Sequence, residues 1–202
     1  MLRELIDPAN MVTAAGLLLS VVAIQIATLG HPEMAVALAL WALLADHLDG
    51  VVAKRTSGRR PLTGRVGKSL DSLADLVSAG IFPGVLLVSI SGGAPWAIVV
   101  AIVLAIASAL RLSYFNSVGL EEGYFIGVPT TYALPLVAAV FLLRSLVSTQ
   151  AFTALLAITL LGVAALHVSA LRVPATRGAM YAVVTSYCVL ASALLLLRSM
   201  QV

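Results

Sequence analysis

Residues 46–75 read DHLDGVVAKRTSGRRPLTGRVGKSLDSLAD, and four aspartates lie in this stretch: Asp46, Asp49, Asp71 and Asp75. On both sides the sequence is so apolar that nearly every long segment has the composition of a membrane span. A carboxylate inside a membrane is costly and needs a partner that compensates its charge. The sequence predicts that this partner is a metal ion.

The composition of the whole chain is that of a membrane protein. Of its 202 residues, 61% are hydrophobic and 10% are charged. Apolar runs of about 20 residues are long enough to cross a bilayer as helices. We therefore expect an all-α fold, a polytopic membrane helical bundle of six to seven transmembrane helices, forming one domain over residues 1–202. The candidate spans are 9–30, 33–54, 69–91, 94–114, 129–147, 150–171 and 178–199, with longer loops at 55–68 and 115–128.

The distribution of positive charge predicts the orientation. Ten of the twelve Lys and Arg residues lie at the N-terminus, around the 55–68 loop, or at helix ends facing that side; Arg144 and Arg198 are the exceptions. Cytoplasmic loops are enriched in Lys and Arg, so we expect an inner or cytoplasmic membrane protein whose polar site faces the cytoplasm. The excess of positive over negative charge favours binding to membrane surfaces and to anionic substrates. We expect no nucleic-acid partner. A single cysteine, Cys188, excludes an intramolecular disulfide.

The spacing of the four aspartates predicts two helix faces that meet. Asp46 and Asp49 are three residues apart and Asp71 and Asp75 are four apart, so each pair lies on one helical face. If the two helices run antiparallel, residues 46 and 75 lie at one depth, and so do residues 49 and 71. Asp46 lies roughly 12 Å along the helix axis from Lys54, which places the carboxylates in the cytoplasmic half of the bilayer.

Four adjacent carboxylates repel one another, and two divalent cations would balance their formal charge. Ligation by oxygen alone favours Mg²⁺ or Mn²⁺. The small residues Gly50, Ala53 and Gly67 share the aspartate faces, so a phosphate or nucleotide can approach the backbone closely. An ion-transport site and a purely structural role in helix packing are the alternatives.

These residues resemble the signature of the CDP-alcohol phosphotransferases, D-x2-D-G-x2-A-R-x8-G-x3-D-x3-D. The four aspartates occupy matching positions, as do Gly50, Ala53 and Gly67. Two departures stand out, because Lys54 replaces the signature arginine and twelve residues, rather than eight, separate Lys54 from Gly67. Lys54 or the adjacent Arg55 would then take the place of that arginine.

The resemblance implies a metal-dependent transfer of a phosphatidyl group from CDP-diacylglycerol to an alcohol, with release of CMP. It assigns metal ligation, by two divalent cations, to Asp46, Asp49, Asp71 and Asp75, and makes Asp75 the group that takes the proton from the attacking hydroxyl. It also implies a homodimer. For Asn10 and Thr13, capping of the first helix is an equally good explanation. The residues expected at the nucleotide are Asn10, Thr13, Gly50, Ala53, Lys54 and Gly67.

Two further segments concern the acceptor alcohol. The sequences LRLSYFN at 110–116 and FIGVPTTYA at 125–133 resemble the corresponding region of bacterial and archaeal phosphatidylserine synthases. This resemblance implies L-serine as the acceptor, with choline, glycerol 3-phosphate or inositol phosphate as alternatives for the same chemistry and a cation transporter as a remote one. Arg111 would bind the serine carboxylate, although a basic residue at a helix end is also a common membrane anchor. The residues expected at the acceptor or lipid phosphates are Arg111, Asn116, Arg55 and Lys68.

Overall fold

Prolines set where most of the long helices begin. In the computed structural model, which describes residues 2–175 and 178–200, helices α2 (Pro8–Thr28), α3 (Pro32–Arg55), α4 (Pro61–Asp75) and α6 (Pro95–Val118) all have a proline in the first turn. Proline suits this position because its backbone angle is already helical and its missing N–H would have had no helical partner. Asp7 caps α2 by accepting a hydrogen bond from the backbone N–H of Asn10 at 3.3 Å.

The rest of the described chain adds further helices and two short strands. The remaining elements are α1 (Leu2–Leu5), the π-helical segment η1 (Leu76–Ile81), α5 (Phe82–Ile90), β1 (Tyr124–Ile126), the 3-10 turn η2 (Thr130–Tyr132), α7 (Ala133–Leu142), the 3-10 turn η3 (Arg144–Leu146), α8 (Thr149–His167), β2 (Arg172–Pro174) and α9 (Ala179–Ser199).

The prediction of a polytopic membrane helical bundle is confirmed. Within the described residues, six helical segments are long and apolar enough to cross a membrane. They are Pro8–Thr28, Pro32–Arg55, Pro61–Ile90, Pro95–Val118, Thr149–His167 and Ala179–Ser199. The chain is therefore an integral membrane protein. The single domain over residues 1–202 stays a prediction, and residues 1, 176–177 and 201–202 lie outside the described part.

Three expected boundaries need correction. The expected span 129–147 is a shorter apolar segment, Thr130–Leu146, in which 3-10 turns flank the ten residues of α7. The expected loop 55–68 is mostly helix, because α4 already begins at Pro61. The expected loop 115–128 is partly ordered, since α6 runs to Val118 and β1 pairs antiparallel with β2 in a two-stranded sheet, a small departure from an all-α fold.

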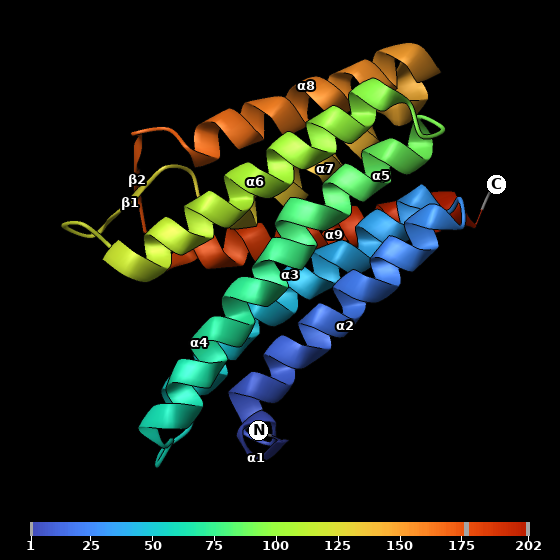
Figure 1. Ribbon diagram of the computed structural model, residues 1–202. Coiled ribbons are helices and arrows are strands. Elements are labelled where there is room, and N and C mark those ends of the chain that lie inside the picture. The colour runs from blue at the N-terminus through green and yellow to red at the C-terminus, as the bar shows by residue number, and fades with distance from the viewer. Residues whose placement is uncertain (1, 176–177, 201–202) are drawn as a thin grey trace.

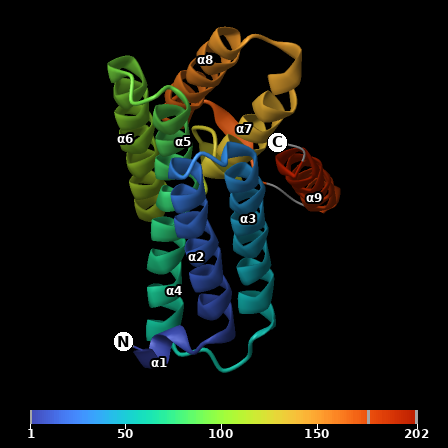
Figure 2. The ribbon, with the colours of Figure 1, turned by 90° about the vertical axis from the view of Figure 1, so that its right-hand side faces the viewer.

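Helices α2, α3 and α4 run side by side and form one half of the molecule (Figure 2). The continuous rod α4–η1–α5 then carries the chain to α6 and α8, and α9 crosses behind to pack on α3 and α7 (Figure 1). Small residues let α2 and α3 approach closely: a Cβ placed on Gly16 would lie 3.2 Å from the Cβ of Ala45. Close packing of small residues is how membrane helices associate, because lipid offers no hydrophobic drive between them.

A methyl group at Gly84 is expected to destabilise the contact between α5 and α6. Its Cβ would lie 2.8 Å from the Cβ and 3.0 Å from the Cα of Ala101, so backbone must move. We expect Gly84→Ala to cost about 1–3 kcal/mol through overpacking, and thermal unfolding in detergent to show a lower midpoint. Gly162→Ala in α8 is the matched control, because a Cβ there meets nothing within 4 Å. A Gly84→Ala protein as stable as the Gly162→Ala protein would contradict this packing.

Candidate functional site

Three of the predicted carboxylates meet between α3 and α4. One oxygen each of Asp46, Asp49 and Asp71 lie within 4.8 Å of one another. Asp75 belongs to the same group through Asp46, because both line a small cavity of about 10 Å³ beneath α2. That volume is close to the least that holds one water molecule. The antiparallel pairing expected from the sequence thus brings the aspartates of the two helices together.

No cation among the described residues forms an ion pair with this cluster. The ion pairs among the described residues involve Glu4, Asp7, Glu33 and Glu122, and none involves the four aspartates. Their protein partners are neutral hydroxyls: Thr13 Oγ1 donates to Asp49 Oδ2, and Thr130 Oγ1 donates to Asp75 Oδ2 at 3.3 Å. Buried charges need a counter-charge, and an all-carboxylate donor set suits a hard divalent cation. The residues present are therefore compatible with a metal centre at Asp46, Asp49 and Asp71.

A cavity of about 230 Å³ opens beside this cluster. Four residues predicted to contact the nucleotide line it together with two candidate metal ligands, Asp49 and Asp71. Gly67 is needed where α4 approaches α2, because a Cβ there would collide with the side-chain oxygen of Asn10. The lining comprises Ala9, Asn10, Thr13, Asp49, Ala53, Arg59, Gly64, Gly67, Lys68 and Asp71.

Three other predicted residues lie elsewhere. Gly50, Lys54 and Arg55 are exposed and do not line this cavity. Gly50 lies on the Asp46–Asp49 helix but has open space around it, since a Cβ there would meet nothing within 4 Å. Neither Lys54 nor Arg55 thus occupies the place at the cavity that the signature arginine was expected to fill.

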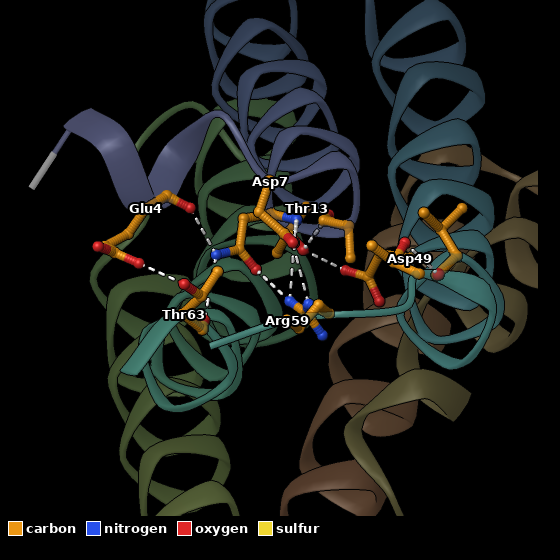
Figure 3. A network of polar contacts seen from close by, with 10 residues as sticks. Glu4, Asp7, Thr13, Asp49, Arg59 and Thr63 are labelled. Atoms are coloured by element: carbon orange, nitrogen blue, oxygen red, sulfur yellow. Dashed lines mark hydrogen bonds and ion pairs between the residues drawn. The ribbon is translucent and has the colours of Figure 1, made fainter. Parts of the chain in front are cut away.

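A polar network ties the N-terminus to the start of α4 at the mouth of the cavity (Figure 3). Asn10 is its centre: Nδ2 donates to the carbonyl oxygens of Glu4 at 2.8 Å and Thr63 at 3.3 Å, and Oδ1 accepts from Arg59 Nη2 at 2.9 Å. The Glu4 carboxylate accepts from Thr63 Oγ1 and pairs with Arg60 Nη2 at 2.5 Å. Asn10 therefore faces the cavity with an amide already held by three protein partners.

The two acids of this network are held ionised. The hydrogen bond from Thr63 lowers the pKa of Glu4, and the charge of Arg60 acts in the same direction against the effect of burial. Burial acts to raise the pKa of Asp7, but its hydrogen bonds to Arg59 and to the backbone of α2 outweigh this and hold the pKa below its usual value. Both groups therefore remain carboxylates that anchor arginines.

Arg59 is a charged residue of the cavity wall that was not among the predicted site residues. Its Nη2 pairs with Asp7 Oδ1 at 2.8 Å, and its Nε donates to Asp7 Oδ2 at 3.1 Å. It lies in the segment between α3 and α4, which is longer than in the signature. That extra length and the replacement of the signature arginine by Lys54 were the two signals in the sequence that this segment differs from the family pattern.

A second, larger cavity of about 610 Å³ lies beside α6 and the end of α8. Arg111 lines it with a side chain only 5% exposed, and its guanidinium lies 5.6 Å and 5.5 Å from the ring centres of Phe115 and Phe125. His167 lines it too, and its Nδ1 lies 3.0 Å from the carbonyl oxygen of Val128. Arg111 Nε and His167 Nε2 are buried without a hydrogen-bond partner among the described residues.

Two of the other residues predicted for the acceptor, Asn116 and Lys68, do not line the second cavity. Asn116 is exposed, and its Nδ2 donates to Ser72 Oγ at 2.9 Å. Lys68 lines the 230 Å³ cavity, and its Nζ lies 5.9 Å from the ring centre of Phe115. The centre of the Phe115 ring thus lies 5.9 Å from a cation of the first cavity, Lys68, and 5.6 Å from a cation of the second, Arg111.

Contacts between α6 and the α4–η1–α5 rod show how deep Arg111 lies. Asn116 contacts Ser72, and Ser108 contacts Gly80, where an added Cβ would be 2.8 Å from the Ser108 Cβ. In this antiparallel register Arg111 lies opposite residue 77, two residues from Asp75. The buried arginine and the carboxylate cluster are therefore at nearly the same level of the bundle.

Comparisons with known proteins show the family of this chain. The family model described as CDP-alcohol phosphatidyltransferase matches residues 7–201. The archaetidylserine synthase of Methanothermobacter thermautotrophicus is 35% identical over 114 residues, which are 56% of this chain and 48% of that protein. The CDP-diacylglycerol–serine O-phosphatidyltransferase of Helicobacter pylori J99 is 34% identical over 138 residues, 66% of this chain and 56% of that protein.

The protein with the same name from Mycobacterium bovis is 36% identical over 115 residues, 53% of this chain and 39% of that protein. The chain thus matches about half the length of these relatives. The family model, in contrast, covers nearly all of the chain and includes the aspartates, the cavity and the buried arginine. This chain belongs to the CDP-alcohol phosphatidyltransferase family.

Proposed function

We propose that the protein transfers a phosphatidyl group from CDP-diacylglycerol to L-serine, giving phosphatidylserine and CMP. The observation that carries this proposal is the carboxylate cluster, which forms no ion pair among the described residues, beside a cavity lined by Asn10, Thr13, Ala53 and Gly67. Family membership supports the CDP-linked chemistry, and the names of the relatives support serine.

Asp46, Asp49, Asp71 and Asp75 would hold two divalent cations, Mg²⁺ or Mn²⁺. Such ions, when bound, neutralise the diphosphate and stabilise the charge that develops on the departing CMP. The chain itself orients the metal-binding carboxylates, because the Thr13 hydroxyl donates a hydrogen bond to one oxygen of Asp49. Asp46 links the two parts of the site, since it shares one cluster with Asp49 and Asp71 and lines a small cavity together with Asp75.

Asp75 is the proposed base. Thr130 donates to its Oδ2, which holds the carboxylate in place and leaves Oδ1 to take the proton from the serine hydroxyl. The hydroxyl oxygen then forms a bond to the phosphorus next to the diacylglycerol. The bond from that phosphorus to the CMP oxygen breaks, and its electron pair leaves with CMP.

Arg111 is the proposed partner of the serine carboxylate. Its Nε is buried without a hydrogen-bond partner among the described residues, and it lies near the level of Asp75. An arginine at such a site matches the planar geometry of a carboxylate and is strongly favoured when little water is present. Asn116 would contribute an amide at the edge of the same region, and the exposed Arg55 would contact lipid phosphates.

We further propose an inner or cytoplasmic membrane location, with the site on the cytoplasmic side, and a homodimer. Six cations gather at the ends of α3 and α4 nearest the cavity, as expected for a cytoplasmic end. They are Lys54, Arg55, Arg59, Arg60, Arg65 and Lys68. The dimer rests on the family resemblance alone, and cross-linking in native membranes tests it.

An acceptor panel tests the proposed reaction. Purified protein with CDP-diacylglycerol and Mn²⁺ or Mg²⁺ should release CMP with L-serine, and at least about tenfold more slowly with ethanolamine, which is serine without the carboxylate that Arg111 would bind. Choline, glycerol 3-phosphate and inositol phosphate complete the panel. CMP formation with one of these and none with serine would overturn the serine assignment, and no CMP with any acceptor would overturn the reaction.

A further inference from the structure

The segment between α3 and α4 carries a basic residue that lines the cavity, whereas the basic residue at the signature position does not. Lys54 and Arg55 are exposed and do not line the 230 Å³ cavity. Arg59, four residues further on, does line it. The segment between α3 and α4 therefore places a guanidinium in the cavity wall next to α2, where Arg59 pairs with Asp7.

The guanidinium of Arg59 is fixed along one edge. Nε donates to Asp7 Oδ2 at 3.1 Å, while Nη2 donates to Asp7 Oδ1 at 2.8 Å and to Asn10 Oδ1 at 2.9 Å. An arginine has five N–H groups, and these bonds use three of them. The other two are on Nη1, which has no hydrogen-bond partner among the described residues. The side chain is 18% exposed and Nη1 is not among the buried polar atoms, so Nη1 is accessible to a ligand in the cavity.

The partners of Arg59 are themselves held in place. Asp7 caps α2, and the Asn10 amide is fixed by carbonyl oxygens of Glu4 and Thr63. Figure 3 shows Arg59 facing Asp7, with the Thr13–Asp49 pair to one side, close to where α2, α3 and α4 come together. A donor held in this way loses little conformational freedom when a ligand binds, which increases affinity.

The place of Arg59 in the cavity indicates what it contacts. A Cβ at Gly67 would lie 3.2 Å from Arg59 Nη2, and Gly67 is one helical turn, about 6 Å, from Asp71. The cavity thus has carboxylates at one end and a guanidinium about one turn away. A ligand that brings negative charge to both ends, through metal ions at the first and directly at the second, fits this arrangement.

We propose that Arg59 donates from Nη1 to a phosphate oxygen of the CMP half of the substrate, and so does the work expected of the signature arginine. The inference rests on the proposed function, because it assigns the cavity to the cytidine nucleotide. A hydrogen bond from a guanidinium to phosphate is among the stronger interactions that a side chain can make. Arg59 is then a substrate-binding residue that no sequence motif marks.

The experiment compares Arg59→Gln with Arg60→Gln in the full chain, purified in detergent with Mg²⁺. Calorimetry measures the affinity for CMP and for cytidine, which lacks the phosphate. Arg59→Gln should weaken CMP binding by about tenfold to a hundredfold and leave cytidine binding unchanged. Arg60→Gln is the matched control, because Arg60 pairs with Glu4 in the same network and does not line the cavity. It should bind both ligands like the unmodified protein.

Several outcomes would overturn the assignment. They are equal CMP affinity in the two variants, an equal loss of CMP and cytidine binding, or a larger loss of CMP affinity in Lys54→Gln. If Arg59→Gln fails to fold, Arg59→Lys is measured instead. It should show a smaller loss of affinity, confined to CMP, because lysine keeps the positive charge but cannot bind both Asp7 oxygens and a phosphate as arginine does. If the unmodified protein binds CMP yet releases none from CDP-diacylglycerol, the proposed reaction fails while the CMP titrations still decide the role of Arg59.

Discussion

Replacing Asp75 by asparagine is expected to lower the rate of CMP release from CDP-diacylglycerol by about a hundredfold to ten-thousandfold, the range typical of a lost general base. Asparagine has nearly the same shape and can still accept the hydrogen bond that Thr130 donates to Oδ2. It cannot take a proton from the serine hydroxyl. Initial rates of CMP formation at saturating serine measure the effect, because the loss should appear in kcat.

The stability of the same variant separates a catalytic role from a structural one. Asp75 lies beside like charges that form no ion pair among the described residues, so removing its charge should leave the metal-free thermal midpoint unchanged or raise it. Glu33→Gln, at the opposite end of α3, is the control: it removes a carboxylate that pairs with Arg144 but is far from the cluster in sequence and should keep the rate. An Asp75→Asn protein that retains full activity, or one that unfolds, would argue against Asp75 as the base.

Removing divalent cations should have a comparably large effect. We expect excess EDTA to abolish CMP release and added Mg²⁺ or Mn²⁺ to restore it, because the carboxylate cluster has only neutral hydroxyl donors as protein partners. Binding at a hundred times the dissociation constant would stabilise the folded protein by about 2.7 kcal/mol. The thermal midpoint of the metal-free protein should therefore rise with added cation.

The matching variant for this experiment is Asp46→Asn, since Asp46 shares a cluster with Asp49 and Asp71 and a small cavity with Asp75. Its thermal midpoint should respond far less to Mg²⁺ or Mn²⁺ than that of the unmodified protein. The metal assignment would be wrong if CMP release persisted in excess chelator, or if the cation raised the midpoint of both proteins equally.

The sequence predicted the parts of the site that depend on helical periodicity. Asp46, Asp49 and Asp71 meet because three- and four-residue spacing places them on facing helix sides, and this holds however the loop between the helices is folded. The helical membrane bundle followed from apolar length alone. Both are local properties, which explains why they were visible without any tertiary structure.

The rest depended on contacts between distant segments. Arg59 reaches the cavity because Asp7 and Asn10, about fifty residues away, hold its guanidinium, and no local pattern records that pairing. The β1–β2 pairing joins residues 124–126 to residues 172–174 and was missed for the same reason. The start of α4 was misplaced because charged residues and glycines resembled a loop, whereas Pro61 begins a helix there.

The rod from Pro61 to Ile90 contains 30 residues, so it is about 45 Å long, whereas the hydrocarbon layer of a bilayer is about 30 Å thick. If it stands close to the bilayer normal, roughly ten residues extend past the acyl chains, and the charged first turns of α4 are the part suited to do so. The reaction would then take place where two phases meet. Its water-soluble product can diffuse into bulk solvent from the open end, while the new phospholipid drifts away sideways within its own leaflet, so neither has to cross the path of the other.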